Sequence, residues 1–231
     1  MIKFTSYLIY FLFLFVHGAF QNKSLAQQFH RIKADYSIKY KDPQGNQVLQ
    51  MGVVFYDINS RKIVMKNGFP VREIVVLTDS SIYQIRNNSI FASQKTYSLS
   101  ELSIFHMALT GSLSNFGLDK TGYQLDTVKN DKGLVLSSWL PPKNNLNLGK
   151  ILLSTKDKQL FGIVFLNPQD NIIAKHFFRD YTNIKGFDFP TEVLVVTYQD
   201  EKEVFHLTKY TNIELEDTKN DEYYNFKIPS N

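Results

Sequence analysis

Cysteine is absent from this 231-residue sequence, and its absence excludes several features. The chain can form no disulfide bond, offers no thiol as a metal ligand, and has no N-terminal cysteine to carry the acyl chains of a bacterial lipoprotein. The folded state must therefore be stabilised by a hydrophobic core. Hydrophobic residues make up 43% of the sequence and aromatic residues 14%, which is enough for one globular domain of this length.

The apolar run near the N-terminus is too short to span a membrane. It covers residues 7–16 (YLIYFLFLFV), follows the basic Lys3 and precedes the small residues Gly18 and Ala19. A transmembrane helix needs about 20 apolar residues, whereas the apolar region of a secretory signal needs roughly 7–15. The sequence therefore predicts a signal peptide over 1–19, export across the inner membrane to the periplasm, and a single soluble domain over 20–231.

Patterns typical of nucleic-acid binding and of catalysis are also missing. The net charge is only +4, and the basic residues are interspersed with acidic ones, so we expect no nucleic-acid partner. The histidines outside the leader (His30, His106, His176 and His206) have no metal-ligand spacing. No nucleophile motif or phosphate-binding loop is present. We therefore predict a non-enzymatic binding protein without a metal or a cofactor.

Most of the sequence alternates between apolar and polar residues, with turn residues between the alternating segments. Runs such as 48–58 (VLQMGVVFYDI) and 191–198 (TEVLVVTY) are rich in β-branched and aromatic residues. The segment 150–166 predicts a hairpin around Asp157-Lys158. We expect about eleven to thirteen antiparallel strands. A short amphipathic helix is predicted near the N-terminus, where Leu25, Phe29 and Ile32 have helical spacing.

A second predicted helix interrupts the strands at residues 97–111 (YSLSELSIFHMALTG). Ser98 and Glu101 have the spacing of a capping box, and Gly111 supplies a stop. One arc of the helix is apolar, and the opposite arc is small and almost uncharged. A further turn is expected over 112–118. Two interpretations remain open: the helix is a lid over an apolar concavity of the sheet, or it is a crossover helix packed in the core.

The order of features resembles the LolA family, the periplasmic carriers of outer-membrane lipoproteins. The resemblance rests on 52–66 (GVVFYDINSRKIVMK), Pro70 followed by 75–85 (VVLTDSSIYQI), 89–111, and the later hairpins over 123–142 and 149–181. It implies an incomplete antiparallel β-barrel with short helices that cover an apolar cavity for acyl chains. The family's Arg-Pro pair, whose Arg latches the lid, is Ile58-Asn59 here.

The resemblance and the alternation together predict the residues that contact lipid. The cavity wall is expected to include Phe55, Ile74, Val76, Tyr83, Phe91 and Trp139, and the cover is expected to contribute Leu102, Phe105, Leu109 and Phe116. The implied cargo is lipoprotein acyl chains or a related lipid. The implied partners are an inner-membrane release complex and an outer-membrane acceptor, with the carrier a monomer. The alternative is a non-catalytic envelope assembly or interaction module with the same fold.

Overall fold

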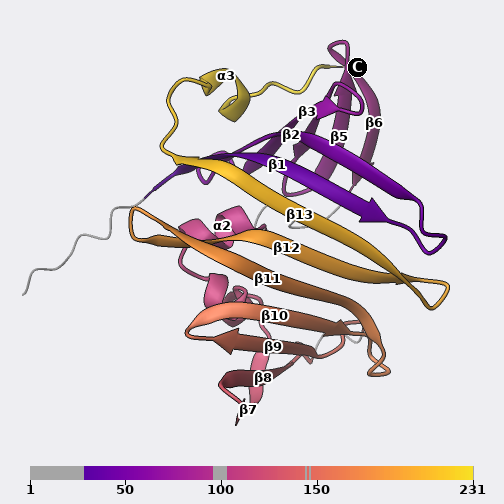
Figure 1. Cartoon of the computed structure of the whole chain (residues 1–231), viewed down its shortest axis with the longest axis vertical. Coiled ribbons are helices and arrows are strands. Elements are labelled where there is room, and N and C mark those ends of the chain that lie inside the picture. The colour runs from indigo at the N-terminus through magenta and orange to yellow at the C-terminus, as the bar shows by residue number, and fades with distance from the viewer. Residues whose placement is uncertain (1–28, 96–102, 144, 146, 231) are drawn as a thin grey trace, which may run out of the picture.

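The computed structural model describes residues 29–95, 103–143, 145 and 147–230. They form one antiparallel sheet of 13 strands in the order β6-β5-β4-β3-β2-β1-β13-β12-β11-β10-β9-β8-β7 (Figure 1). The first six strands are β1 (Arg31–Lys41), β2 (Gln47–Asp57), β3 (Lys62–Phe69), β4 (Glu73–Leu77), β5 (Ser81–Arg86) and β6 (Ser89–Lys95). The remaining strands are β7 (Gln124–Asp131), β8 (Leu134–Leu140), β9 (Ile151–Lys156), β10 (Gln159–Leu166), β11 (Ile172–Ile184), β12 (Phe187–Gln199) and β13 (Lys202–Leu215).

The sheet is an open barrel, which confirms the predicted fold class. Strand β1 pairs with both β2 and β13, so the first and last strands of the sequence lie side by side at the middle of the sheet. Strands β6 and β7 are the two edges and do not pair with each other. The predicted hairpin is present as β9 and β10, and its turn residues Asp157 and Lys158 have φ values of 51° and 66°.

The prediction of an N-terminal helix is wrong for the second half of that segment. Strand β1 begins at Arg31, so Ile32 belongs to a strand, and Leu25 lies outside the described residues. Ile32, Ala34 and Tyr36 are all buried, while the residues between them are partly exposed. This period of two places one side of β1 in the core, and it overrides the helical spacing of Leu25, Phe29 and Ile32.

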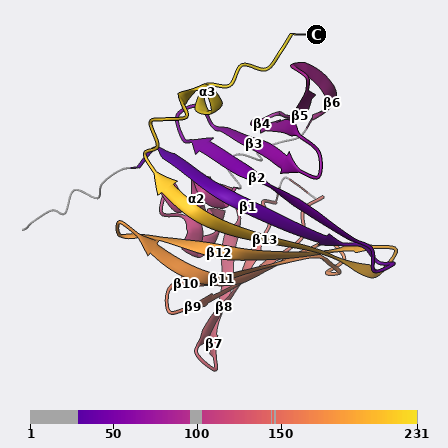
Figure 2. The same cartoon turned by 45° about the horizontal axis from the view of Figure 1, so that its top comes forward.

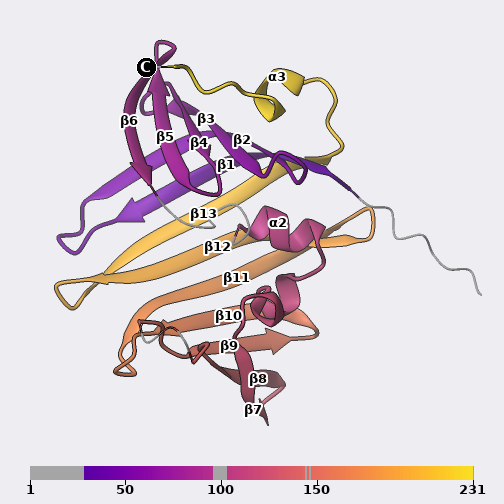
Figure 3. The same ribbon diagram turned by 180° about the vertical axis from the view of Figure 1, so that it is seen from behind.

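Short helices cover the two faces of the sheet. The inner face, around which the sheet curves, carries α2 (Ile104–Leu109), η2 (Leu113–Asn115) and η3 (Leu118–Lys120) (Figure 3). The outer face carries α3 (Asp221–Tyr224), which lies over β2 and β3 on the side away from α2 (Figure 2). The structure therefore has a large core under α2 and a smaller core under α3. In the described residues, no helix is long and apolar enough to cross a membrane.

Strands β1 to β3 pack closely at Gly52. The register of β2 and β3 shifts between Met51 and Gly52, which marks a bulge in the pairing. A Cβ atom at Gly52 would lie 2.3 Å from the carbonyl oxygen of Lys66 and 2.9 Å from the hydroxyl of Tyr36. Only glycine fits this position without a backbone shift.

Candidate functional site

The helix α2 begins and ends with local hydrogen bonds. Its N-cap is Ser103, whose Oγ accepts a hydrogen bond from the His106 backbone N–H at 3.1 Å. At its C-terminal end, Gly111 has a φ of 68°, and the Ser112 backbone N–H donates to the Met107 carbonyl at 2.8 Å. The predicted stop at Gly111 is thus confirmed. The expected capping pair, Ser98 and Glu101, lies outside the described residues.

Phe105 anchors α2 on the inner face of the sheet. Its side chain is 4% exposed, and its ring centroid lies 5.4 Å from that of Tyr210 and 5.7 Å from that of Phe189. A hydrogen bond of 2.7 Å joins the Tyr56 hydroxyl to Nδ1 of His106 on the next position of the helix. The helix is therefore both a cover for the sheet and a part of the main core.

Phe116 holds the next turn of chain on the same face. It ends η2 in the left-handed conformation, with a φ of 54°, and it is 5% exposed. Its ring lies 5.9 Å from Phe165 and 6.4 Å from His176, both on the sheet. The segments on either side of Gly111 therefore both anchor aromatic side chains on the inner face.

A cavity of about 280 Å³ remains between these segments and the sheet. Its lining comes from seven strands and from the covering segments: Tyr36, Val54, Ile63, Met65, Leu77, Ser103, Ile104, Phe105, Phe116, His176, Phe178, Val193, Val195, Thr208 and Tyr210. The volume lies just below the range for small-molecule pockets, about 300–1,000 Å³. It suits one short apolar group.

The described part of the lining is uncharged at neutral pH. None of the described lining side chains is an Asp, Glu, Lys or Arg. Burial lowers the pKa of His176 from 6.5 to about 4, so its imidazole is neutral at pH 7. Burial also raises the pKa of the Tyr36 and Tyr210 hydroxyls, which stay protonated. A neutral apolar wall of this kind favours hydrocarbon over a charged ligand.

The structure places the described sequence-predicted site residues in four environments. Phe105 and Phe116 line the cavity, and Leu109 and Trp139 pack on the same inner-face core without lining it. Phe91 lies on the edge strand β6 and is 63% exposed. Leu102 lies outside the described residues.

Four predicted wall residues lie on the opposite face of the sheet. Phe55, Ile74, Val76 and Tyr83 belong to the smaller core under α3. They therefore do not line the cavity under α2, where Val54 and Met65 are found instead, and Phe55 points the other way. Alternation shows which residues share a face but not which face is concave.

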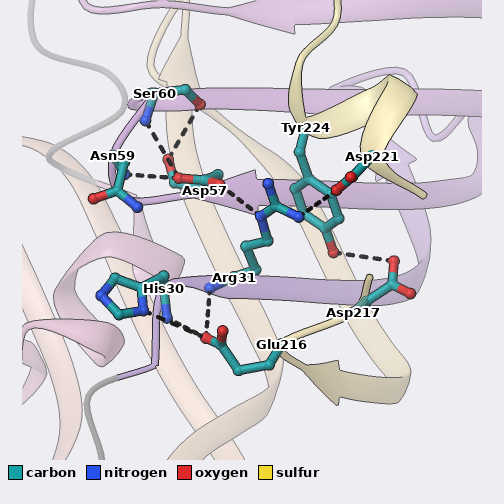
Figure 4. A network of polar contacts seen from close by, with 9 residues as sticks. All are labelled: His30, Arg31, Asp57, Asn59, Ser60, Glu216, Asp217, Asp221 and Tyr224. Carbon is teal, nitrogen blue, oxygen red and sulfur yellow. Dashed lines mark hydrogen bonds and ion pairs between the residues drawn. The ribbon is translucent and has the colours of Figure 1, made fainter. Parts of the chain in front are cut away.

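The segment that covers the outer face is fixed by stacking and by ion pairs. The rings of Phe55 and Tyr223 are stacked with their centroids 4.6 Å apart. Arg31 lies between Asp57, at 2.7 Å from its Nε, and Asp221 of α3, and its guanidinium lies 4.6 Å from the centroid of the Tyr224 ring (Figure 4). This network connects α3 to β1 and β2, so the outer face beneath it is closed.

Sequence reasoning missed the part of the lining that β12 and β13 supply. Val193, Val195, Thr208 and Tyr210 reach the cavity from these strands. The alternation of Val193 and Val195 was visible in the sequence. The sequence did not show which strands lie beside this segment, because β13 pairs with β1 and so joins positions such as Tyr36 and Tyr210 that are far apart in the chain.

No protein-family model and no curated protein sequence matches this chain. Solved structures do match. A LolA superfamily protein from Nitrosomonas europaea aligns over 85% of this chain and 90% of its own, with 11% identity and a TM-score of 0.55. A domain from Vibrio parahaemolyticus, described as an outer membrane lipoprotein-sorting protein domain, aligns over 86% and 91%, with 8% identity and a TM-score of 0.61.

The fold and its cavity define a class of protein, namely open β-barrels in which helices cover an apolar hollow. Within this class the chain has a LolA-like fold, as its order of features predicted.

Proposed function

We propose that this protein is a non-enzymatic periplasmic carrier that holds an acyl chain of a lipoprotein, or of a related lipid, in the cavity under α2. The observation that carries the proposal is that the described lining residues of that cavity are uncharged and mostly apolar. Burying hydrocarbon there contributes about 0.8 kcal/mol per CH₂, so apolar area is the main requirement for affinity. The proposed molecule is a monomer formed by residues 20–231 after removal of a signal peptide over 1–19.

The cavity volume bears on how the cargo enters. About 280 Å³ is small for the acyl groups of a whole lipoprotein, so the covering segments must move outward when the full cargo binds. An inner-membrane release complex would supply the cargo and an outer-membrane acceptor would take it. Transfer between them needs no bond to be made or broken.

Native mass spectrometry of protein purified from a periplasm tests the proposal directly. We expect adducts with lipid masses, and displacement of the lipid by a fluorescent fatty acid. Folded, lipid-free protein that binds neither a fatty acid nor a diacyl lipid would contradict a carrier function.

A matched pair of variants locates the binding. Val195 lines the cavity, whereas the adjacent Leu194 lies on the outer face and pairs with Phe177 and Leu207. Both side chains are partly buried. We expect Val195→Trp to fill the cavity and abolish fatty-acid binding, and Leu194→Trp to preserve it. Equal binding by both variants would place the lipid elsewhere.

One feature favours the alternative, a non-catalytic envelope assembly or interaction module. A groove of about 370 Å³ lies on the outer face of β7 to β11, where Leu152 is 41% exposed and Leu136 is 37% exposed. An exposed apolar groove is typical of a protein-binding surface. If purified protein carries no lipid and instead retains a protein partner that Leu152→Lys releases, the module replaces the carrier.

A further inference from the structure

A second concavity lies at the rim of the sheet, away from the cavity under α2. It has a volume of about 690 Å³ and forms where β3 ends, β4 begins and β5 turns into β6, next to the C-terminal segment. We call it the rim groove; its main side chains are Lys66, Arg72, Glu73, Ile74, Ile85 and Arg86. The two linings share no residue. Where they come closest along the chain, Val53 and Lys66 line the rim groove, and the adjacent Val54 and Met65 line the cavity under α2.

The charge of the rim groove is unbalanced. Among the described residues of its lining, three cationic side chains, from Lys66, Arg72 and Arg86, face one carboxylate, that of Glu73. This carboxylate is already engaged: Oε2 accepts from Nε of Arg86 at 2.9 Å, and Oε1 accepts from Nδ2 of Asn67 at 3.0 Å. The groove therefore has an excess of positive charge.

The cations of the rim groove are held in place. The Arg86 guanidinium lies 4.3 Å from the centroid of the Phe91 ring, and the Lys66 ammonium lies 4.6 Å from the centroid of the Tyr223 ring while donating to the Tyr223 hydroxyl. Arg72 is exposed and makes no ion pair with the other described residues. Two fixed cations and one exposed arginine that line the same groove can bind a single anion at a small entropic cost.

Apolar side chains complete the groove beside these cations. Ile85 is 3% exposed, and Val53, Ile74 and Phe226 are partly buried in the same lining. A simple inorganic anion would leave this surface uncovered. The combination suits a ligand with an anionic head and a short hydrocarbon stem.

We propose that the rim groove is a second ligand site, which binds the phosphate head group of an amphiphile through Arg72, Lys66 and Arg86. Arginine binds phosphate oxygens in a bidentate manner, which makes Arg72 the main contact. The stem of the amphiphile packs on Ile74 and Phe226. The same chemistry is supplied by a phospholipid in a bilayer and by a soluble alkyl phosphate.

A backbone-amide NMR titration of the full chain with hexyl phosphate tests the site. We expect shifts at residues 66–68, 72–74 and 85–88, weaker binding at higher salt, and no such shifts with hexan-1-ol. Inorganic phosphate alone should bind more weakly than hexyl phosphate. Shifts confined to the cavity under α2, around Val193 and Tyr210, would overturn the proposal.

Three variants test whether the charge of Arg72 is needed for binding. Arg72→Ala should weaken hexyl phosphate binding about tenfold, and Arg72→Lys should weaken it less, because a point charge replaces a bidentate donor. The control is Lys202→Ala, which removes the same charge at the exposed start of β13. Fatty-acid binding in the cavity should be unchanged in all three variants, so this test is independent of the carrier function.

A second experiment, with lipid vesicles, shows whether the head group belongs to a phospholipid in a bilayer or to a soluble alkyl phosphate. If the site binds phospholipid in a bilayer, vesicles of phosphatidylcholine with phosphatidylglycerol should co-sediment with the native chain but not with Arg72→Ala. Vesicles of pure phosphatidylcholine should co-sediment with neither protein. Binding of hexyl phosphate without vesicle binding would identify a soluble ligand. If neither probe binds, or if Arg72→Ala binds both as well as the native chain does, the proposal is wrong.

Discussion

Substitutions at two neighbouring residues of α2, Ile104 and Phe105, can distinguish the role of the helix as a cover from its role in the core. Phe105 is 4% exposed and contacts the rings of Tyr56, Phe189 and Tyr210. Ile104 is only partly buried and lines the cavity. A substitution at Phe105 should therefore act mainly on stability, and one at Ile104 mainly on ligand binding.

The magnitudes follow from what each side chain loses. Replacing a buried phenylalanine by alanine costs about 3–5 kcal/mol, so Phe105→Ala should lower the melting temperature on the order of 10 °C. Ile104→Ala removes three carbon atoms from the cavity wall. With about 0.8 kcal/mol for each methylene of contact, it should weaken fatty-acid binding by up to about 2.4 kcal/mol, or up to roughly sixty-fold, and cost less than about 2 kcal/mol of stability.

Urea unfolding and displacement of a fluorescent fatty acid, measured on the same preparations, check both expectations. Leu109→Ala is the matched control, because Leu109 packs on the core from the same helix without lining the cavity. It should lose stability and keep its affinity. If Ile104→Ala binds as tightly as the native chain, or if Phe105→Ala keeps its full stability, the assignment of the two residues is refuted.

Three further predictions concern the sheet. Gly52→Ala should cost about 1–3 kcal/mol in urea unfolding, because its Cβ would lie 2.3 Å from the Lys66 carbonyl oxygen. Burial lowers the pKa of His176 to about 4, so between pH 6.5 and 4 the unfolded chain binds a proton that the folded chain does not. The free energy of unfolding should fall by up to about 3 kcal/mol as the pH drops through this range, and His176→Phe should remove that part of the dependence. Tyr56→Phe, which deletes the hydrogen bond to His106, should cost about 1 kcal/mol and speed amide exchange in α2.

Local patterns were enough to predict most of the sheet. The alternation in 191–198 became part of β12, and the turn at Asp157-Lys158 became the β9–β10 hairpin. Both signals act within a few residues, because side chains alternate along a strand and a tight turn needs residues that accept a positive φ. The resemblance in the order of features added the open-barrel fold, which the structural matches confirm.

The faces of β2 could not be predicted in the same way. Val53, Val54, Phe55 and Tyr56 are all apolar or aromatic, so alternation gives no contrast between their two sides. Phe55 points outward because Tyr223 and Tyr224, far along the chain, cover it there. Such a choice depends on long-range packing rather than on local sequence.

An open sheet that is apolar on both faces needs a cover on each, and here the two covers are fixed by different kinds of contact. The outer cover is attached to β1 and β2 by the charged pairs of Arg31 with Asp57 and Asp221. The inner cover, α2, is placed by the packing of Phe105 and by the hydrogen bond between Tyr56 and His106. An acyl chain that enters beneath α2 replaces apolar contacts with equivalent apolar contacts, whereas entry beneath α3 would have to separate charges. For the carrier function proposed above, the chemistry of the two covers therefore favours entry of the acyl chain at the inner face.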